Sequence, residues 1–487
     1  MSKKNQNYTN RKQNRFHPER MRGNAFVNNS GKQWLPGENG RAAKIERLLR
    51  GLEKKEIAGN MAGYKDSGVE WIGAIPEGWN VSKVKHETSF IGSGTTPRSG
   101  CLSFYENGTI PWIQSGDLYE TSEVTDTKQK ITAEALRSSS ALKVYDKDFI
   151  AMAMYGSIGN IAISRIAACV NQACCCLRPN SRNNLNYMYY FLKTSTDNFK
   201  SKAMGAVLQN ISQEKIKKQD FLVPPLHEQQ RIADFLDAKC DILDRTIDAV
   251  SRQIEDLEKY KKALITKTVT KGICKKGEPE RAMKDSGVEW IGGIPEEWDV
   301  KRNSLNFDIR KTLVGENWSN MQLLSLTTNG VKNITIDDQV GKRPKTLATY
   351  QIAHKNDIVM CLFDLDASAV FSGLCKKNGI ISPAYKLLKC KNGMFPPYAE
   401  YYFRAVFDGR KYKKYAKSIR YTISTNDFMH LKMPVPPLAE QQQIADYLDE
   451  KCKNIDNRVQ KRRQQLEWLK EYKKSLIFDY VTGKKRV

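Results

Sequence analysis

Residues 224–237 read PPLHEQQRIADFLD, and residues 436–449 read PPLAEQQQIADYLD. The second stretch follows the first by 212 positions, and the same offset still relates Tyr260-Lys261-Lys262 to Tyr472-Lys473-Lys474. Proline fixes φ and disfavours helix in the residue before it, so each Pro-Pro pair ends one element and can open a helix. The chain therefore contains a duplicated segment, and each copy begins a helix.

Apolar residues follow each helix start at alternating spacings of four and three, which is the a/d pattern of a coiled coil sustained over about four heptads. The seam of the first copy contains Leu236, Leu243, Ile247, Val250, Ile254, Leu257 and Leu264, and that of the second contains Leu448, Ile455, Val459, Leu466, Leu469 and Leu476. One helix cannot bury such a strip alone. Because a whole domain separates the copies, we expect them to pair within the chain as an antiparallel coiled coil. Two independent core helices are the alternative.

A second repeat precedes each variable region. Residues 65–79 read KDSGVEWIGAIPEGW, and residues 284–298 read KDSGVEWIGGIPEEW, 219 positions later. Two tryptophans, several glycines and a proline in so short a block predict a packed entry strand and turn with a structural role. The order is therefore block, variable domain and helix, repeated once.

These boundaries divide the chain into five parts. The predicted fold class is α+β, with two mixed α+β domains separated by two long α-helices that form an antiparallel coiled coil. Buried strands are expected at 149–154 and 357–362, and helices with aromatic faces at 186–200 and 398–414. The parts are a basic, disordered extension at 1–64, a first variable domain at 65–223, a first helix at 224–272, a second variable domain at 273–435 and a second helix at 436–487.

Charge and composition narrow the functional classes. The 79 Lys and Arg residues outnumber the 54 Asp and Glu residues, so the net charge is +25 and a polyanion is the expected partner. No apolar run of about 18 residues and no signal-peptide pattern occurs, which predicts a cytoplasmic protein without a membrane span. The eleven cysteines, including Cys174-Cys175-Cys176, lack the spacing of a zinc site, and the five histidines are scattered. Reduced, buried thiols are expected.

The duplicated layout resembles the DNA-specificity subunit of Type I restriction–modification systems. The resemblance covers Lys65 to Gly483, and the Pro-Pro-Leu-x-Glu-Gln-x-x-Ile-Ala helix starts are its most specific part. The second domain departs from the family pattern and keeps only a family-like segment at 418–423. The first domain carries further family-like segments in Gly94-Thr95-Thr96-Pro97, Ile110 to Leu118, Gly156-Ser157-Ile158-Gly159 and Asn171-Gln172-Ala173.

This resemblance implies a non-catalytic subunit that binds double-stranded DNA. In the family, the two variable domains are target-recognition domains, and each reads one half of a split DNA target. The helices set the length of the unread DNA spacer between the halves. The subunit also scaffolds two modification (methyltransferase) subunits, which restriction (translocase and nuclease) subunits join. No cofactor is expected on this chain; S-adenosylmethionine, ATP and Mg²⁺ are expected on the partner subunits.

Direct readout of bases needs polar or basic side chains on loops that reach a groove. Each candidate can also serve as a phosphate contact or a solvated surface group. A basic cluster at 410–417 suits phosphates, for which charge matters more than geometry. The candidates are Thr96, Arg98, Gln114, Ser115, Gln172, Gln209 and Asn210 in the first domain, and Lys342, Arg343, Lys345, Arg420, Tyr421 and Thr422 in the second.

Two other functions remain open. Phe90-Ile91-Gly92-Ser93-Gly94 matches the short Phe-x-Gly-x-Gly motif of S-adenosylmethionine-dependent amino-methyltransferases, so a solitary DNA methyltransferase is one alternative. The matching Asn-Pro-Pro-Tyr/Phe is missing, because Phe395-Pro396-Pro397-Tyr398 lacks the polar first residue. No phosphate-binding Gly-x-x-x-x-Gly-Lys-Ser/Thr loop occurs. The other alternative is a coiled-coil adaptor without a DNA role, which salt-sensitive DNA binding would exclude.

Overall fold

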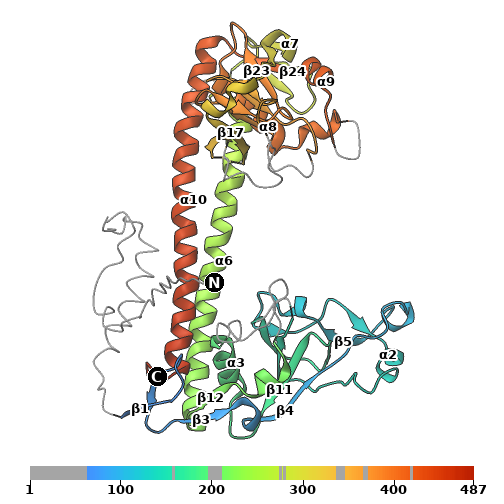
Figure 1. The fold of residues 1–487 in the computed structure, drawn as a ribbon, viewed down its shortest axis with the longest axis vertical. Helices are drawn as coiled ribbons and strands as arrows, with labels where there is room; N and C mark the ends of the chain where they lie inside the picture. Colours follow the sequence, from blue (N-terminus) through green and yellow to red (C-terminus); the bar gives the residue numbers. More distant parts are fainter. Residues whose placement is uncertain are drawn as a thin grey trace, which may run out of the picture. The chain divides into compact units, whose positions relative to one another are not determined.

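The computed structural model describes residues 63–155, 159–195, 211–273, 277, 281–328, 330–335, 346–365, 371–416 and 421–487 (Figure 1). The chain divides into two compact units. The first unit comprises the chain up to Ile232 together with Asp479–Val487, and the second unit comprises Ala233–Phe478. The extension predicted to be disordered at 1–64 lies almost wholly outside the described residues. No helix in the described ranges is long and apolar enough to cross a membrane.

Two long helices follow the Pro-Pro pairs. Helix α6 spans Leu226–Lys271 and helix α10 spans Leu438–Val481. The carbonyls of Pro225 and Pro437 accept the first helical hydrogen bonds, from Glu228 N and Glu440 N, at 2.9 Å in both copies. Since proline has no N–H to leave unsatisfied, it suits this position before the helix.

In the second unit, α6 and α10 pack side by side and run antiparallel (Figure 1). Three ion pairs cross between them: Asp244 with Lys473 at 2.5 Å, Glu258 with Arg463 at 2.7 Å and Lys261 with Asp456 at 2.6 Å. As the residue number along α6 rises, the number of the paired residue on α10 falls, so the two helices run in opposite directions. Every predicted seam residue is buried or half-buried. The antiparallel coiled coil is therefore confirmed.

Two of these ion pairs are copies of each other. Asp244 and Asp456 occupy the same position of the repeat, as do Lys261 and Lys473. In each ion pair the aspartate of one copy therefore meets the lysine of the other copy. The lysine side chains are only 14% and 17% exposed, because they stand at seam positions between apolar neighbours. A charged residue in a seam favours one register, since any slip would bury it without its partner.

The first unit holds its recognition domain between one helix start and one helix end. Trp79 Nε1 donates to Glu228 Oε2 at 2.9 Å, near the start of α6. The Tyr187 hydroxyl donates to Val481 O at 3.2 Å, at the last residue of α10. The indole of Trp79 is 1% exposed, which confirms the structural role predicted for the tryptophan block.

The second unit repeats this plan with equivalent residues. Trp298 Nε1 donates to Glu440 Oε2 at 2.8 Å, near the start of α10. The Tyr398 hydroxyl donates to Val269 O at 3.2 Å, near the end of α6. Each recognition domain is thus fixed by the helix that follows it in sequence and by the far end of the other helix.

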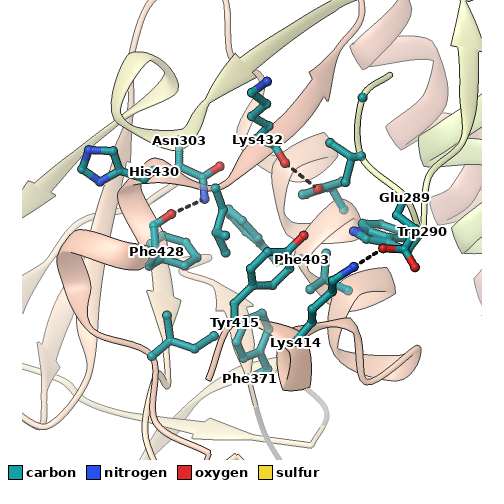
Figure 2. Close-up of a pocket in the computed structure, with 16 residues that line it drawn as sticks. Glu289, Trp290, Asn303, Phe371, Phe403, Lys414, Tyr415, Phe428, His430 and Lys432 are labelled. Atoms are coloured by element: carbon teal, nitrogen blue, oxygen red, sulfur yellow. Dashed lines mark hydrogen bonds and ion pairs between the residues drawn. The ribbon is translucent and has the colours of Figure 1, made fainter. Parts of the chain in front are cut away.

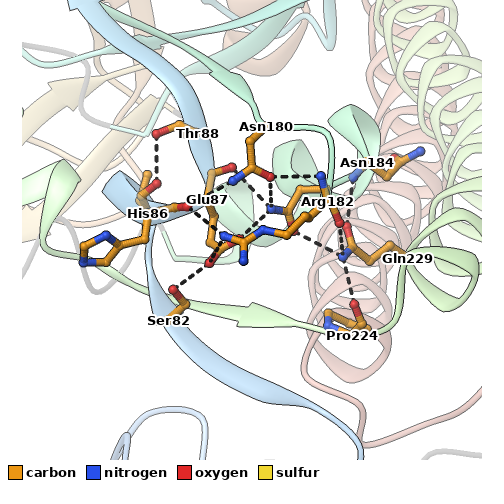
Figure 3. Close-up of polar contacts among 11 residues, drawn as sticks. Ser82, His86, Glu87, Thr88, Asn180, Arg182, Asn184, Pro224 and Gln229 are labelled. Atoms are coloured by element: carbon orange, nitrogen blue, oxygen red, sulfur yellow. Dashed lines mark hydrogen bonds and ion pairs between the residues drawn. The ribbon is translucent and has the colours of Figure 1, made fainter.

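The first glutamine of each helix motif has a structural role that explains why the motif occurs at both helix starts. Gln229 is fully buried; its Oε1 accepts from Asn184 N at 2.9 Å, and its Nε2 donates to Pro224 O at 2.9 Å (Figure 3). Gln441 is also fully buried and makes the same kind of contacts, with Phe395 N and Pro436 O, both at 2.8 Å. A side-chain amide here satisfies backbone groups that a buried helix start would otherwise leave unpaired.

A buried carboxylate extends the network in the first unit. Glu87 is 4% exposed and accepts from Ser82 Oγ and Asn183 Nδ2, both at 2.7 Å. Arg182 lies beside the same carboxylate at 3.4 Å, as Figure 3 shows. These contacts join the start of the recognition domain to the loop that receives Gln229.

The recognition domain of the first unit is built on a five-stranded sheet and a three-stranded sheet. Short helices α2 (Ala133–Arg137), α3 (Leu185–Thr194) and α5 (Gln213–Lys217) accompany them. The five-stranded sheet has the order β4 (Thr88–Ser93), β11 (Cys174–Pro179), β8 (Phe149–Ala153), β9 (Ile161–Ser164) and β6 (Glu123–Val124), and the smaller sheet has β10 (Cys169–Val170), β5 (Ile110–Ile113) and β7 (Lys130–Ile131).

The second recognition domain has the same strand plan although its sequence is different. Helices α7 (Asn303–Asn306), α8 (Pro396–Asp408) and α9 (Thr425–His430) accompany two four-stranded sheets. The first sheet has the order β16 (Phe307–Arg310), β23 (Lys386–Cys390), β20 (Ile358–Met360) and β21 (Ser372–Leu374), and the second has β18 (Gly330–Ile334), β17 (Leu323–Thr327), β22 (Gly379–Ile381) and β19 (Gln351–Ala353). Four antiparallel strands follow the same order in both units, β4-β11-β8-β9 and β16-β23-β20-β21. The smaller sheet of the first unit and the second sheet of the second unit each contain one parallel pair, β5 with β10 and β17 with β22. The first unit adds the edge strand β6, which pairs parallel with β9.

Both domains are also closed by equivalent small sheets. Strand β12 (Asp220–Val223), just before α6, pairs with β3 (Asn80–Lys83). Strand β24 (Lys432–Val435), just before α10, pairs with β15 (Asp299–Arg302). The repeated blocks form the two-stranded sheets β1–β2 (Tyr64–Asp66, Ala74–Pro76) and β13–β14 (Met283–Asp285, Gly293–Pro295).

The predicted local elements are confirmed within the described residues, which leave out 196–200 of the helix expected at 186–200. The strands expected at 149–154 and 357–362 are β8 and β20, and both are fully buried. The helix expected at 398–414 ends at Asp408, because Gly409 caps it and Arg410 adopts a positive φ of 50°. The aromatic residues of α3 and α8, including Tyr187, Phe191 and Tyr398, are core residues.

We expect the seam lysine to control the stability of the helix pair. Lys261→Asp places two carboxylates together at Asp456 and should lower the free energy of unfolding by about 2 kcal/mol. Lys262→Asp, the same change at the exposed next residue, should cost less than about 0.5 kcal/mol. Adding Asp456→Lys to Lys261→Asp should recover most of the loss. Thermal unfolding of the full chain measures all three, and equal losses for the two single variants would contradict a seam role.

We expect the buried Gln229 to contribute far more to the stability of the first unit than the exposed Gln230. Gln229→Ala leaves Asn184 N and Pro224 O without partners and should destabilise the first unit by about 2–3 kcal/mol. Gln230→Ala makes the same chemical change at an exposed position and should stay within about 0.5 kcal/mol. Urea unfolding followed by tryptophan fluorescence compares them. A Gln229→Ala variant as stable as Gln230→Ala would show that the amide network is dispensable.

Candidate nucleic-acid interface

Polar residues of the first unit gather where two parallel strands end. Gln114 and Ser115 follow β5, and Asn171 and Gln172 follow β10. Strands β5 and β10 are hydrogen-bonded neighbours, with Trp112 opposite Cys169 and Ile113 opposite Val170. Because adjacent parallel strands finish at the same edge, the structure brings the predicted readers Gln114, Ser115 and Gln172 together.

A third loop joins this edge through Thr96. Its Oγ1 hydrogen-bonds to Gln172 Oε1. The loop can approach so closely because Gly94 has no side chain: a Cβ there would lie 1.6 Å from Val170 O. The Tyr105 hydroxyl, which donates to Pro97 O at 2.6 Å, holds the far side of the loop. Thr96 and Arg98 therefore belong to the same cluster as the two glutamines.

The backbone beneath the cluster is fixed while its side chains remain accessible. Asn171 N donates to Ile113 O, and Asn171 Oδ1 accepts from Ala173 N, both at 3.0 Å. Gln172 and Arg98 are exposed. A rigid backbone that carries exposed polar side chains is the arrangement that sequence-specific contacts require, since little conformational entropy is then lost on binding.

A pair of amides at this edge has chemistry suited to a base. Gln114 Nε2 donates to Gln129 Oε1 at 2.9 Å. In either orientation of the two amides, the hydrogen bond between them leaves the NH2 group of one glutamine and the oxygen of the other for further partners. Adenine presents the complementary acceptor and donor, N7 and N6–H, in the major groove. Gln129 was missed in the sequence, since it precedes the two-residue strand β7, which is too short to show a period.

The described candidates of the second unit lie elsewhere in their domain. Tyr421 and Thr422 follow the basic turn Lys411–Lys414, and the ammonium of Lys413 lies 4.8 Å from the centre of the Tyr421 ring. Tyr421 has a positive φ of 46°, and its carbonyl accepts from Leu365 N. They are not at the ends of β17 and β22, so the second domain does not gather its predicted residues as the first does.

The turn after β22 shows how the two domains diverge. Ala384 N donates to Ser382 Oγ at 3.4 Å, as Ala173 N donates to Asn171 Oδ1 in the first unit. Pro383 stands where the first unit has Gln172, so this turn carries no amide. Exposed polar residues of the second sheet occur instead on β18, at Lys332 and Asn333, which sequence reasoning also missed. The remaining candidates, Gln209, Asn210, Lys342, Arg343, Lys345 and Arg420, lie outside the described residues.

The glycine motif that matched methyltransferases has a packing explanation. Residues 90–93 lie in the extended strand β4, where Gly92 pairs with Cys176 of β11. A Cβ at Gly92 would lie 2.6 Å from the Tyr145 hydroxyl, and Gly94 passes close to Val170. Both glycines are therefore required by neighbouring protein atoms.

The cysteine run has the character of core packing. Burial raises the pKa of Cys174 and of Cys176 to about 12, so both remain protonated thiols at neutral pH. Thiols in that state are poor nucleophiles and poor metal ligands. Within the described ranges, no cluster of three or more His, Cys, Asp and Glu residues could hold a metal ion.

The chain is similar to proteins of one family. The family described as "Type I restriction modification DNA specificity domain" matches residues 76–259 and 329–467, which is more than half of the chain. The MjaX specificity subunit of Methanocaldococcus jannaschii, described as a type I restriction enzyme subunit, is 26% identical over 436 residues, covering 85% of this chain and 96% of that one. The MjaIX specificity subunit of the same organism is 30% identical over 250 residues, covering half of this chain and 55% of the relative.

A solved structure shares the fold. It is described as "Structural basis underlying complex assembly and conformational transition of the type I R-M system", and it aligns with a TM-score of 0.63 at 14% identity. The alignment covers 84% of this chain and 98% of that chain. With both repeats matched by the family and the duplicated architecture matched by the fold, the chain belongs to the Type I restriction–modification DNA specificity family, whose members supply DNA recognition rather than catalysis.

Proposed function

We propose that this subunit reads a bipartite DNA target, one half-site per recognition domain, and scaffolds methyltransferase and restriction subunits. The observation that carries the proposal is the duplicated plan, in which two domains of one strand order are attached to one helix pair by equivalent contacts. Two readers of one architecture imply two target halves. Two different sets of surface residues, such as Gln172 against Pro383, imply that the halves differ in sequence.

The helix pair supports a fixed gap between the halves. Neither α6 nor α10 contains a glycine or proline, and the exchanged ion pairs hold one register. A stiff connection restricts which spacings allow both readers to bind, because B-DNA advances about 3.4 Å per base pair. Changing the length of the pair should therefore change the length of the unread spacer.

Exposed apolar side chains on the helix pair support the scaffold role. Trp468 is 46% exposed and stacks on Tyr472 with 5.4 Å between ring centres. Ile242 and Tyr260 of α6 are each 57% exposed. Large aromatic residues on a helical surface are typical anchors of protein interfaces, and partner subunits would cover them.

The partners would supply the chemistry. In this proposal the methyltransferase subunits hold S-adenosylmethionine and the restriction subunits use ATP and Mg²⁺, while this chain binds DNA and remains cytoplasmic with them. Its net charge of +25 favours association with DNA and makes that association sensitive to salt.

The direct test is to purify the chain together with the methyltransferase that is encoded beside it, and to map methylated adenines in DNA treated with the complex. We expect a split motif with a constant gap, and exchange of one recognition domain should change one half only. An unsplit motif would contradict the bipartite reading. A chain that shows neither complex formation nor salt-sensitive DNA binding would support the adaptor alternative, and methylation by the chain alone would support a solitary methyltransferase.

The cluster at the strand edge should affect one half-site. Replacing Gln114 and Gln172 with alanine removes the amides and should lower methylation at the cognate motif about 10- to 100-fold, with relaxed preference in one half, as expected from about 1–3 kcal/mol per lost base contact. Gln230→Ala, an exposed glutamine on α6 of the same unit, is the matched control and should leave the motif unchanged. Methylation mapping of both variants provides the measurement. Loss of preference in both halves at once would argue against one reader per half.

A further inference from the structure

A cavity of about 360 Å³ opens in the second unit, between the repeated block, α8, α9 and the basic turn (Figure 2). Six of its sixteen lining residues are Trp, Phe or Tyr. The rings of Trp290 and Tyr402 lie 5.9 Å apart between their centres. The size falls within the range of pockets that hold small organic ligands. The aromatic lining residues are Trp290, Phe371, Tyr402, Phe403, Tyr415 and Phe428.

One polar side chain of the lining has an unmet hydrogen bond. Asn303 is 2% exposed; its Nδ2 donates to Phe428 O at 2.9 Å, and its Oδ1 has no partner among the described residues. The amide cannot be reversed, because its oxygen would then face the carbonyl of Phe428. Figure 2 shows the oxygen turned away from Phe428. The cavity thus contains a buried acceptor without a donor.

The first unit shows that the fold does not require this asparagine. Val84 occupies the equivalent position, just after β3 as Asn303 is just after β15, and it is fully buried. The backbone contact is also equivalent: Val84 N donates to Gln219 O at 3.0 Å, and Asn303 N donates to Leu431 O at 2.8 Å. An apolar side chain satisfies the position in one copy, whereas the other copy keeps a polar atom that is costly to leave unpaired.

Two other polar side chains of the lining have partners. The Tyr402 hydroxyl donates to Lys432 O at 3.2 Å, and Lys414 pairs with Glu289 at the exposed edge. The buried oxygen Asn303 Oδ1 therefore requires one hydrogen-bond donor from a ligand. An indole or a phenol carries one donor and an apolar ring, so burial leaves nothing unsatisfied.

We propose that this cavity binds an aromatic ring with a single N–H or O–H donor, of the indole or phenol class. The donor bonds to Asn303 Oδ1, and the ring packs against Trp290, Tyr402 and Phe403. This site is separate from the strand-edge cluster that we assign to DNA. The ring can come from a free small molecule or from a tryptophan or tyrosine side chain of a partner protein.

The test compares two rings of the same shape on the full chain. Saturation-transfer NMR titrations measure binding of indole and of benzofuran, in which an oxygen replaces the N–H. We expect indole to bind about 10-fold more tightly, the size of one buried neutral hydrogen bond. Asn303→Val copies the first unit and should therefore fold; it should bind both rings with equal affinity. Equal binding of the two rings to the unchanged chain, or no binding of either, would overturn the proposal.

Two further measurements make the result specific. Val406→Trp fills the cavity from α8 and should abolish binding of indole, so persistent binding would place indole elsewhere and refute the site. Adenosine binding more tightly than indole would refute the ligand class. N-acetyltryptophanamide distinguishes the sources: binding comparable to indole supports a partner side chain, and exclusion of it while indole binds supports a free small molecule.

Discussion

The pairing of two amphipathic helices is the constraint on which this structure depends. A strip that repeats every 3.5 residues exposes apolar surface until a second helix covers it, and here the second helix is the other copy of the same sequence. Duplication makes the pairing self-complementary. The aspartate of one copy meets the lysine of the other twice, at 2.6 and 2.5 Å, so a single favourable contact in the repeat is used in both directions. In this antiparallel arrangement the two copies have equivalent surroundings at these contacts.

The same symmetry explains why both helices contribute to each unit. Each recognition domain needs the start of one helix, through Glu228 or Glu440, and the end of the other, through Val481 or Val269. The last residues of the sequence therefore complete the first unit, as Asp479–Val487 cluster with it. A fold of this kind joins distant parts of the sequence through a few anchoring residues.

The sequence was sufficient for the architecture because periodicity and repetition are encoded in many residues at once. Seam positions, the tryptophan blocks and buried strands such as β8 were all predictable from pattern. Helix α8 was predicted too long, since only Gly409 and the positive φ of Arg410 end it. The shared strand order of the two domains was not predictable, because sheets of similar topology tolerate different side chains and β5 pairs with β10 over only two residues.

The candidate DNA surface was predictable only where the backbone could be inferred. Gln114, Ser115 and Gln172 meet because each follows a strand of a parallel pair, whereas Gln129 enters the cluster from a strand too short to recognise. The two copies provide a better guide than either alone. Equivalent positions with the same side chain, such as Gln229 and Gln441, stabilise the fold in both copies. At other equivalent positions the side chains differ, as in the pairs Gln172 and Pro383 or Val84 and Asn303, so the fold does not depend on one particular side chain there. A difference between copies at a structurally equivalent position therefore identifies a side chain that the shared fold does not require.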